Sequence, residues 1–302
     1  MPLIGSVSVF RHAKVARGVA AVFAFLLWGC AGLSGCAAPG SPPAASALAQ
    51  ATTPATSPIT VLRVDASARQ ALAPTGTLRV GVYPGSPTSL VKAADGTPAG
   101  VAHDLGHLLA RDLGVPVRVI EFARLAQVLE ALKAGQIDFT FTNATESRAR
   151  EMDFTAPLVR LELGYLVPAG SRIERIDDID RAGIRVGVAQ GSTSQTLLGA
   201  RLTQASVVGA PSLDAARTML ADGRLDTFAT NKGILNELSD TLSGARILDG
   251  RWGMETMAVA IPKGRDAARP WLQTWADTIA VDGRLRAAVQ RSGLRGLAND
   301  RN

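Results

Sequence analysis

Apolar residues recur along this chain with two alternating spacings. Residues 78–82 form a short run that is nearly all apolar, which is typical of a buried strand. The leucines between positions 105 and 113 instead recur at three- and four-residue spacing, which predicts a helix that ends at Gly114. The same alternation continues through most of the chain, so it predicts strands and helices that follow one another in turn.

Each half of the chain repeats this alternation. The predicted strands and helical stripes follow in order: strands 78–82, 117–120, 137–141, 184–188, 207–208 and 225–229, and helices near 104–113, 125–132, 194–200 and 213–220. Alternation of this kind predicts parallel sheets covered by helices, an α/β class of fold. Later helices near 270–279 and 282–290 are expected to pack back on the first half.

Two segments are repeated in the same order in both halves. Residues 78–86 (LRVGVYPGS) and 184–192 (IRVGVAQGS) are identical at six of nine positions, and residues 135–143 and 223–231 at four of nine. Two ordered repeats predict two lobes of like architecture. We assign residues 75–163 plus 258–302 to lobe 1 and 164–257 to lobe 2, with extended segments near 160–167 and 257–261 as the two crossings.

The first 35 residues form a separate unit. Three basic residues precede an apolar stretch at 19–33, whose length suits a signal peptide better than a membrane span. Leu33-Ser34-Gly35-Cys36 matches a lipoprotein maturation site, so we expect lipidation of Cys36 and anchoring to a membrane in the periplasm or cell envelope. An ordinary secretory signal with an incidental cysteine is the alternative. Residues 36–74, rich in Ala, Pro, Ser and Thr, are predicted to form a flexible tether.

Composition narrows the class of partner. The chain is 47% hydrophobic and carries a net charge of +6, which falls to +3 once the three basic residues of the signal are removed. Aromatic residues make up only 5%. A weak, scattered positive charge with few stacking side chains argues against nucleic acid as a partner. Without Cys30, the mature part keeps only Cys36, so no disulfide is expected.

Polar residues follow the predicted strands in both halves. In open parallel sheets ligands bind beyond the carboxyl ends of strands. We therefore expect one interlobe cleft that is lined by residues of both halves: Tyr83, Ser86, Thr142, Asn143, Ser192, Thr193 and Asn231. Ser192 and Thr193 begin a predicted helix, whose free N–H groups attract a carboxylate; a plain helix cap is the alternative.

Arg148 comes shortly after a strand end and offers a guanidinium that can grip a carboxylate at two points. A surface salt bridge with Glu146 or Glu151 is the alternative reading of this residue.

The chain from 78 to 263 resembles the polar amino-acid class of bacterial solute-binding proteins, which have the type II periplasmic binding fold. The resemblance is carried by LRVGV at 78–82, GVAHDL at 100–105, ALKAGQID at 131–138, TESR at 145–148, MDFTAP at 152–157 and VAQGST at 188–193. It implies that Arg148 clamps a ligand carboxylate and that Ser192 and Thr193 contact the same group. It also implies a monomer that delivers a small anionic or zwitterionic solute to an ABC transporter permease.

The sequence departs from the family pattern around the ligand. Ser86, Ser89 and Leu125 stand at places where the family usually has aromatic residues. Asn231 stands where the family has the Asp that pairs with the ligand ammonium, which argues against an ordinary α-amino acid. Glu255 is a candidate for the missing negative partner, with a surface glutamate as the alternative.

Other functions have weaker support. Some relatives of this fold are periplasmic dehydratases, for which only Glu255 is a candidate general acid or base. His103 and His107 have a possible metal-binding spacing but lack the intervening glutamate of zinc proteases, so a helix-surface pair is favoured. A sensory module is a third possibility. We predict no catalytic residue, metal or cofactor.

Overall fold

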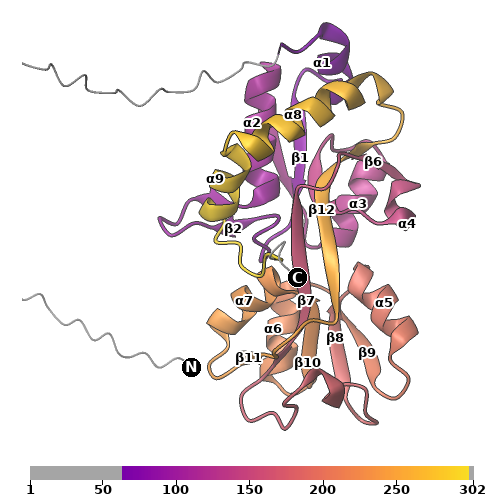
Figure 1. Cartoon of the computed structure of the whole chain (residues 1–302), viewed down its shortest axis with the longest axis vertical. Coiled ribbons are helices and arrows are strands. Elements are labelled where there is room, and N and C mark those ends of the chain that lie inside the picture. Colours follow the sequence, from indigo (N-terminus) through magenta and orange to yellow (C-terminus); the bar gives the residue numbers. More distant parts are fainter. Residues whose placement is uncertain (1–62, 299–302) are drawn as a thin grey trace, which may run out of the picture. The chain divides into compact units, whose positions relative to one another are not determined.

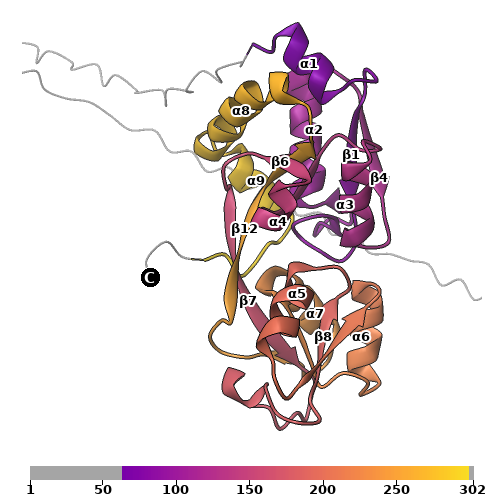
Figure 2. The ribbon, with the colours of Figure 1, turned by 90° about the vertical axis from the view of Figure 1, so that its right-hand side faces the viewer.

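The computed structural model describes residues 63–298, which form two lobes joined by two long strands (Figure 1). Strand β7 (Val159–Val167) and strand β12 (Gly253–Pro262) pair antiparallel and run from one lobe into the other. Figure 2 shows both strands from the side, between the upper and lower helices. Within residues 63–298, none of the helices is long and apolar enough to cross a membrane.

The first lobe is built on a parallel pair of strands and on two strands that pair with β12. Strand β1 (Leu78–Val82) lies parallel to β4 (Val117–Glu121), while β5 (Thr140–Asn143) and β6 (Met152–Phe154) pair antiparallel with β12. The remaining elements of this lobe are α1 (Ala66–Leu72), the hairpin of β2 (Val91–Lys92) and β3 (Pro98–Ala99), α2 (Val101–Leu113), α3 (Leu125–Lys133), α4 (Glu146–Ala149), η2 (Asp266–Ala268), α8 (Arg269–Val281) and α9 (Arg284–Arg291).

The second lobe continues the same sheet. Strands β9 (Ser206–Ala210), β8 (Arg185–Ala189) and β10 (Thr227–Asn231) lie parallel, and β10 pairs antiparallel with β7. The remaining elements are η1 (Ile176–Asp178), α5 (Thr193–Arg201), α6 (Leu213–Ala221), α7 (Lys232–Thr241) and β11 (Arg246–Ile247). The predicted alternation of strands and helices is confirmed in both halves, but the large sheet is mixed and not purely parallel, because the crossing strands β7 and β12 pair antiparallel with their neighbours.

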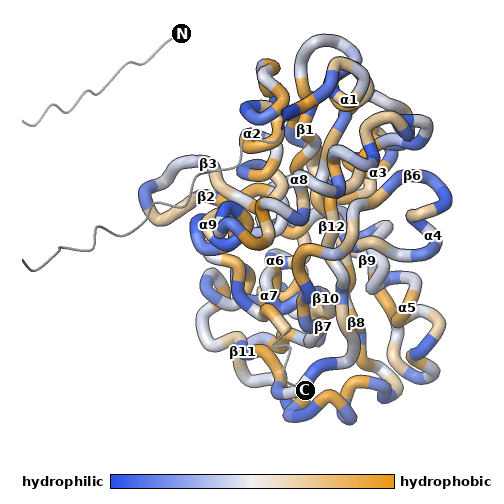
Figure 3. The backbone as a smooth tube through the Cα atoms, turned by 45° about the horizontal axis from the view of Figure 1, so that its top comes forward, coloured by the Kyte–Doolittle hydropathy of each residue, from blue (hydrophilic) through white to orange (hydrophobic). Residues whose placement is uncertain are grey.

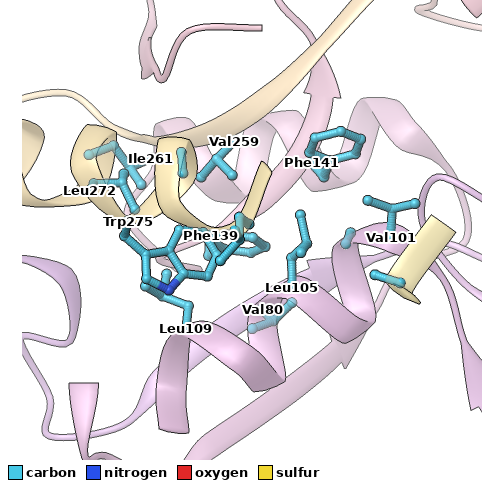
Figure 4. Close-up of a cluster of buried hydrophobic side chains, with 14 of the residues drawn as sticks. Val80, Val101, Leu105, Leu109, Phe139, Phe141, Val259, Ile261, Leu272 and Trp275 are labelled. Atoms are coloured by element: carbon cyan, nitrogen blue, oxygen red, sulfur yellow. The ribbon is translucent and has the colours of Figure 1, made fainter. Parts of the chain in front are cut away.

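The C-terminal helices pack on the first lobe, as predicted. Figure 4 shows Trp275 and Leu272 of α8 against Leu105 and Leu109 of α2 and Phe139. These side chains are buried, and removing each of them from water contributes roughly 1.5–3 kcal/mol to the stability of the fold. Figure 3 shows the matching pattern, with hydrophobic stretches along the inner strands and hydrophilic positions recurring on outer helices such as α9.

The folded body begins earlier than the predicted tether allows. Helix α1 covers residues 66–72, and the Asp65 side chain caps it by accepting a hydrogen bond from Ala68 N at 2.6 Å. Ala68 and Leu72 share one face and are fully buried in the first core. The tether prediction is therefore wrong for residues 66–72, because this face has a core to pack against. The predicted signal, Cys36 and the earlier tether lie outside the described residues.

The segment after α9 lies beside the crossing strand β7 and forms a third link between the lobes. After α9, the chain runs beside β7: Glu162 N donates to Gly296 O at 3.0 Å, and Ala298 N donates to Arg160 O at 2.9 Å. Because β10 pairs with β7 only from Leu163 onward, the backbone groups at 160–162 are free for this pairing. Arg295 forms ion pairs with Glu237 and Asp240, so the end of predicted lobe 1 contacts the second lobe.

Candidate functional site

A cavity of about 40 Å³ lies between the lobes and is lined by residues of both. It gathers seven of the predicted site residues: Tyr83, Thr142, Asn143, Arg148, Ser192, Asn231 and Glu255. The expectation that polar residues after the predicted strands line one cleft therefore agrees with the position of this cavity. The lining also includes Thr88 and Arg124, which the sequence reasoning missed.

Arg148 lines the cavity and exposes only 9% of its surface. Thr145 caps the short helix α4 by accepting from Arg148 N at 3.2 Å. The guanidinium Nη1 donates to Thr142 Oγ1 at 3.0 Å and to the Asn143 carbonyl at 3.1 Å. Burial lowers the pKa of Arg148, with the charge of Glu255 acting in the opposite direction, but an arginine stays protonated.

The surface salt bridge considered for Arg148 does not form. Glu146 pairs with Arg150 at 3.6 Å, and Glu151 pairs with Lys133 at 2.9 Å. Within residues 63–298, only Nη1 of the Arg148 guanidinium has hydrogen-bond acceptors. The Nε and Nη2 groups are therefore left to bind a planar anion such as a carboxylate.

Ser192 lies across the cleft from the first lobe. Its Oγ accepts a hydrogen bond from Gln195 N at 3.2 Å, so Ser192 both caps α5 and lines the cavity. Thr193 does not line the cavity. Its Oγ1 accepts from Asn143 Nδ2 at 3.5 Å, and it borders a neighbouring outer hollow instead. The structure thus places Thr193 at the rim, as a contact between the lobes.

Asn231 and Glu255 form a buried pair. Asn231 caps α7 by accepting from Ile234 N at 3.1 Å, and its Nδ2 donates to Glu255 Oε2 at 2.9 Å. Glu255 exposes 8% of its surface, so the alternative of a surface glutamate is wrong. Burial raises the pKa of Glu255, although the Asn231 hydrogen bond and the Arg148 charge act to lower it. A carboxyl group thus stands beside Asn231, where the family pattern has an aspartate.

Lys232, the neighbour of Asn231, does not add positive charge to the cavity. It pairs with Glu162 at 2.6 Å and is absent from the cavity lining.

Ser86 is not brought to the cleft. Gly85 has a φ of +82°, and bridges from residues 84 and 86 to Leu90 fold the loop inward. Ser86 is consequently fully buried, and its hydroxyl lies 2.9 Å from Thr88 Oγ1. Thr88 lines the cavity in its place, which a strand-end rule cannot anticipate because the loop turns back on itself.

The two lobes touch each other around the cavity. A Cβ added at Gly191 would lie 2.9 Å from Ala126 Cβ, and one at Gly85 would lie 3.3 Å from Leu213. Both glycines have positive φ, so they provide the turns as well as the close approach. The lobes are therefore closed over the cleft.

The histidine pair lies away from this site. The rings of His103 and His107 on α2 are 4.6 Å apart, and His103 Nδ1 lies 2.7 Å from Asp104 Oδ1. Within residues 63–298 there is no group of three or more His, Cys, Asp or Glu that could hold a metal ion.

Two α/β lobes, antiparallel crossing strands and a polar cavity between them define a two-lobed binding protein. Residues 78–293 match the bacterial extracellular solute-binding proteins, family 3, and the chain belongs to that family. It is 24% identical over 221 residues to the L-arginine-binding protein of Pseudomonas aeruginosa, covering 69% of this chain and 85% of that one. It is 24% identical over 199 residues to the glutamine-binding protein GlnH of Bacillus subtilis, covering 65% and 72%.

Solved structures show the same fold. The solute receptor for L-cysteine of Neisseria gonorrhoeae superposes with a TM-score of 0.67 at 22% identity, covering 76% of this chain and 99% of that one. The predicted type II periplasmic binding fold is thereby confirmed.

Proposed function

We propose that this protein captures a small solute bearing a carboxylate in the interlobe cleft and presents it to the permease of an ABC importer. The observation that carries the proposal is Arg148, a buried guanidinium whose Nη1 is fixed by Thr142 and Asn143. A buried cation without a charged partner is costly, so a bound carboxylate would stabilise it. The relatives named for arginine and glutamine binding support an amino acid or a related acid.

Closure of the lobes would bury such a ligand. Ser192 faces the cavity from the second lobe, so a carboxylate held by Arg148 would gain contacts there only when the lobes meet. A ligand that binds the closed form more tightly shifts the protein toward that form. The permease would then recognise the closed protein.

A thermal-shift screen of small carboxylic acids, followed by calorimetry, tests this function. A bound acid should raise the melting temperature by mass action. Arg148→Gln should abolish the shift, while Arg150→Gln, an exposed arginine that follows the same short helix, should leave it unchanged. Undiminished binding by Arg148→Gln would contradict the proposal.

Anchoring through Cys36 is part of the proposal and is supported by the Leu33–Cys36 pattern. Mass spectrometry of the protein from membranes should show a lipid on Cys36 as the first residue. Cys36→Ala should leave the signal uncleaved at this site and the protein without lipid.

The dehydratase alternative is supported by a single feature, the buried Glu255 with its raised pKa. Turnover of a cyclic carboxylic acid by the wild-type protein, lost in Glu255→Gln, would favour catalysis over capture. Unchanged acid recovered after prolonged incubation would favour capture.

A further inference from the structure

Arg124 is a second cation beside the cleft, and the proposed function leaves it unused. It follows β4 and stands immediately before α3, and its side chain lines the cavity together with Leu125. Its Nε is buried and has no hydrogen-bond partner. Within residues 63–298, no carboxylate lies within ion-pair distance of its guanidinium. A partly buried arginine with an unsatisfied donor at the wall of a binding site points to a missing anionic partner.

The charges on the cavity wall are unequal. Of the residues that line it, Arg124 and Arg148 are cationic and Glu255 is the single acid. A ligand with one carboxylate and one ammonium group would leave one guanidinium without a counter-charge. A ligand with two carboxylates and one ammonium would match all three side chains, and complementarity of this kind governs specificity more than raw affinity.

We propose that Arg124 forms a second carboxylate subsite, so that the ligand is a compact amino dicarboxylic acid held by Arg148, Arg124 and Glu255. The inference rests on the proposed function, because it keeps Arg148 as the site of the first carboxylate. Glu255 then takes the ammonium group, because it is the single acid that lines the cavity and the Asn231 amide carries no charge.

The apolar walls of the closed cavity favour the shortest members of this class. Leu125, Leu213 and Met257 contribute these walls. A long aliphatic side chain such as that of arginine would have to displace these walls. An acid with one methylene between its two halves, such as L-aspartate, requires less of that displacement and is therefore the first member of the class to test.

Calorimetry on the full-length protein in detergent tests the inference, with bound ligand first removed by unfolding and refolding. L-aspartate should bind roughly tenfold to a hundredfold more tightly than L-alanine, which lacks the second carboxylate. Arg124→Gln should remove this preference by weakening L-aspartate binding much more than L-alanine binding. Arg124→Lys should restore part of it. Arg118→Gln, an exposed arginine on β4 away from the cavity, should change neither ligand.

Equal binding of L-aspartate and L-alanine to the wild type would overturn the second subsite, and so would an equal loss of both in Arg124→Gln. Succinate binding as tightly as L-aspartate would overturn the role of Glu255 toward an ammonium group. A monocarboxylic acid that binds through Arg148 with no advantage for L-aspartate would refute this inference and leave the proposed function standing. Failure of every acid in the screen to bind the wild type would refute both.

Discussion

Both lobes contain an arginine–aspartate pair at equivalent positions of the sequence repeat. In the first lobe, Asp138 accepts from Arg79 N at 2.9 Å and from its Nη2 at 2.7 Å. In the second, Asp226 accepts from Arg185 N at 2.7 Å and from its Nη2 at 2.8 Å. Each pair ties the start of a strand to the start of a later one, so the repeated sequence reproduces the same bond in both lobes.

The lobes differ at the cleft. The first lobe contributes both cations, Arg148 and Arg124, whereas the second contributes neutral helix caps, Ser192 and Asn231, and the single acid, Glu255, lies on the crossing strand β12. The shared arginine–aspartate pair thus joins the same strands in both lobes. The loops that follow those strands differ in charge between the lobes. We infer that the first lobe would supply most of the binding free energy and the second would mainly supply closure.

The largest expected difference in free energy of unfolding concerns the two arginine–aspartate pairs. Asp138 is fully buried and also binds Arg265, so Asp138→Asn should lower the free energy of unfolding by about 3–5 kcal/mol. Asp226→Asn should cost less, because that pair is 34–41% exposed. Urea denaturation of both variants measures the difference, and equal losses would contradict it.

The pH dependence of unfolding sharpens the same comparison. Burial alone would raise the pKa of Asp138, but hydrogen bonds from Arg79 and Arg265 outweigh it and lower the pKa. A lowered pKa stabilises the fold above the unfolded value, and that contribution is lost as pH falls through the folded value. The difference in free energy of unfolding between the wild type and Asp138→Asn should therefore become smaller as pH falls.

The charge difference between the lobes should also appear in the binding affinities of variants in each lobe. Arg148→Ala should weaken binding of an identified acid by about 2–5 kcal/mol, because it removes a buried charge partner. Ser192→Ala should weaken binding less, by about 0.5–1.5 kcal/mol, because it removes a neutral hydroxyl from the cavity wall. Calorimetry of both variants, with Ser192→Gly as a control that largely preserves the cap, tests this order. An equal loss for Arg148→Ala and Ser192→Ala would reverse our assignment of roles.

Two matched glycines should give equal effects. A Cβ at Gly81 would lie 2.2 Å from Ile137, and one at Gly187 would lie 2.4 Å from Leu225. Gly81→Ala and Gly187→Ala should each destabilise the protein by about 1–3 kcal/mol through overpacking. Gly199→Ala on α5, which meets open space, should be neutral or stabilising by up to about 1 kcal/mol. Clearly unequal effects in thermal unfolding would show that the repeat is not packed alike.

The smallest expected effect concerns Glu255 between the lobes. Its raised pKa means that the folded state keeps a proton that the unfolded state loses. Stability without ligand should therefore fall as pH rises from the ordinary glutamate pKa to the raised one. Glu255→Gln should flatten this fall in thermal scans across pH. A slope that persists in the variant would assign the titration to another group.

Much of the fold was predictable because its signals are local. Strand runs, helical stripes and the two repeats gave the order of elements, and the strand-end rule brought Arg148, Ser192 and Asn231 to one cleft. Arg124 lies at the carboxyl end of β4, so the same rule applied to that strand would have found it.

Tertiary packing decided the rest. Helix α1 exists because Ala68 and Leu72 meet a core formed by distant segments. Ser86 turns inward because its loop pairs with Leu90, and Glu255 reaches the cleft because the β7–β12 register sets its face. The sequence by itself determined the order and the approximate extent of most elements, since periodicity and turn residues act over a few positions. Only the three-dimensional arrangement decided which side chains share a cavity, because that cavity brings together residues as distant in the sequence as Tyr83 and Met257.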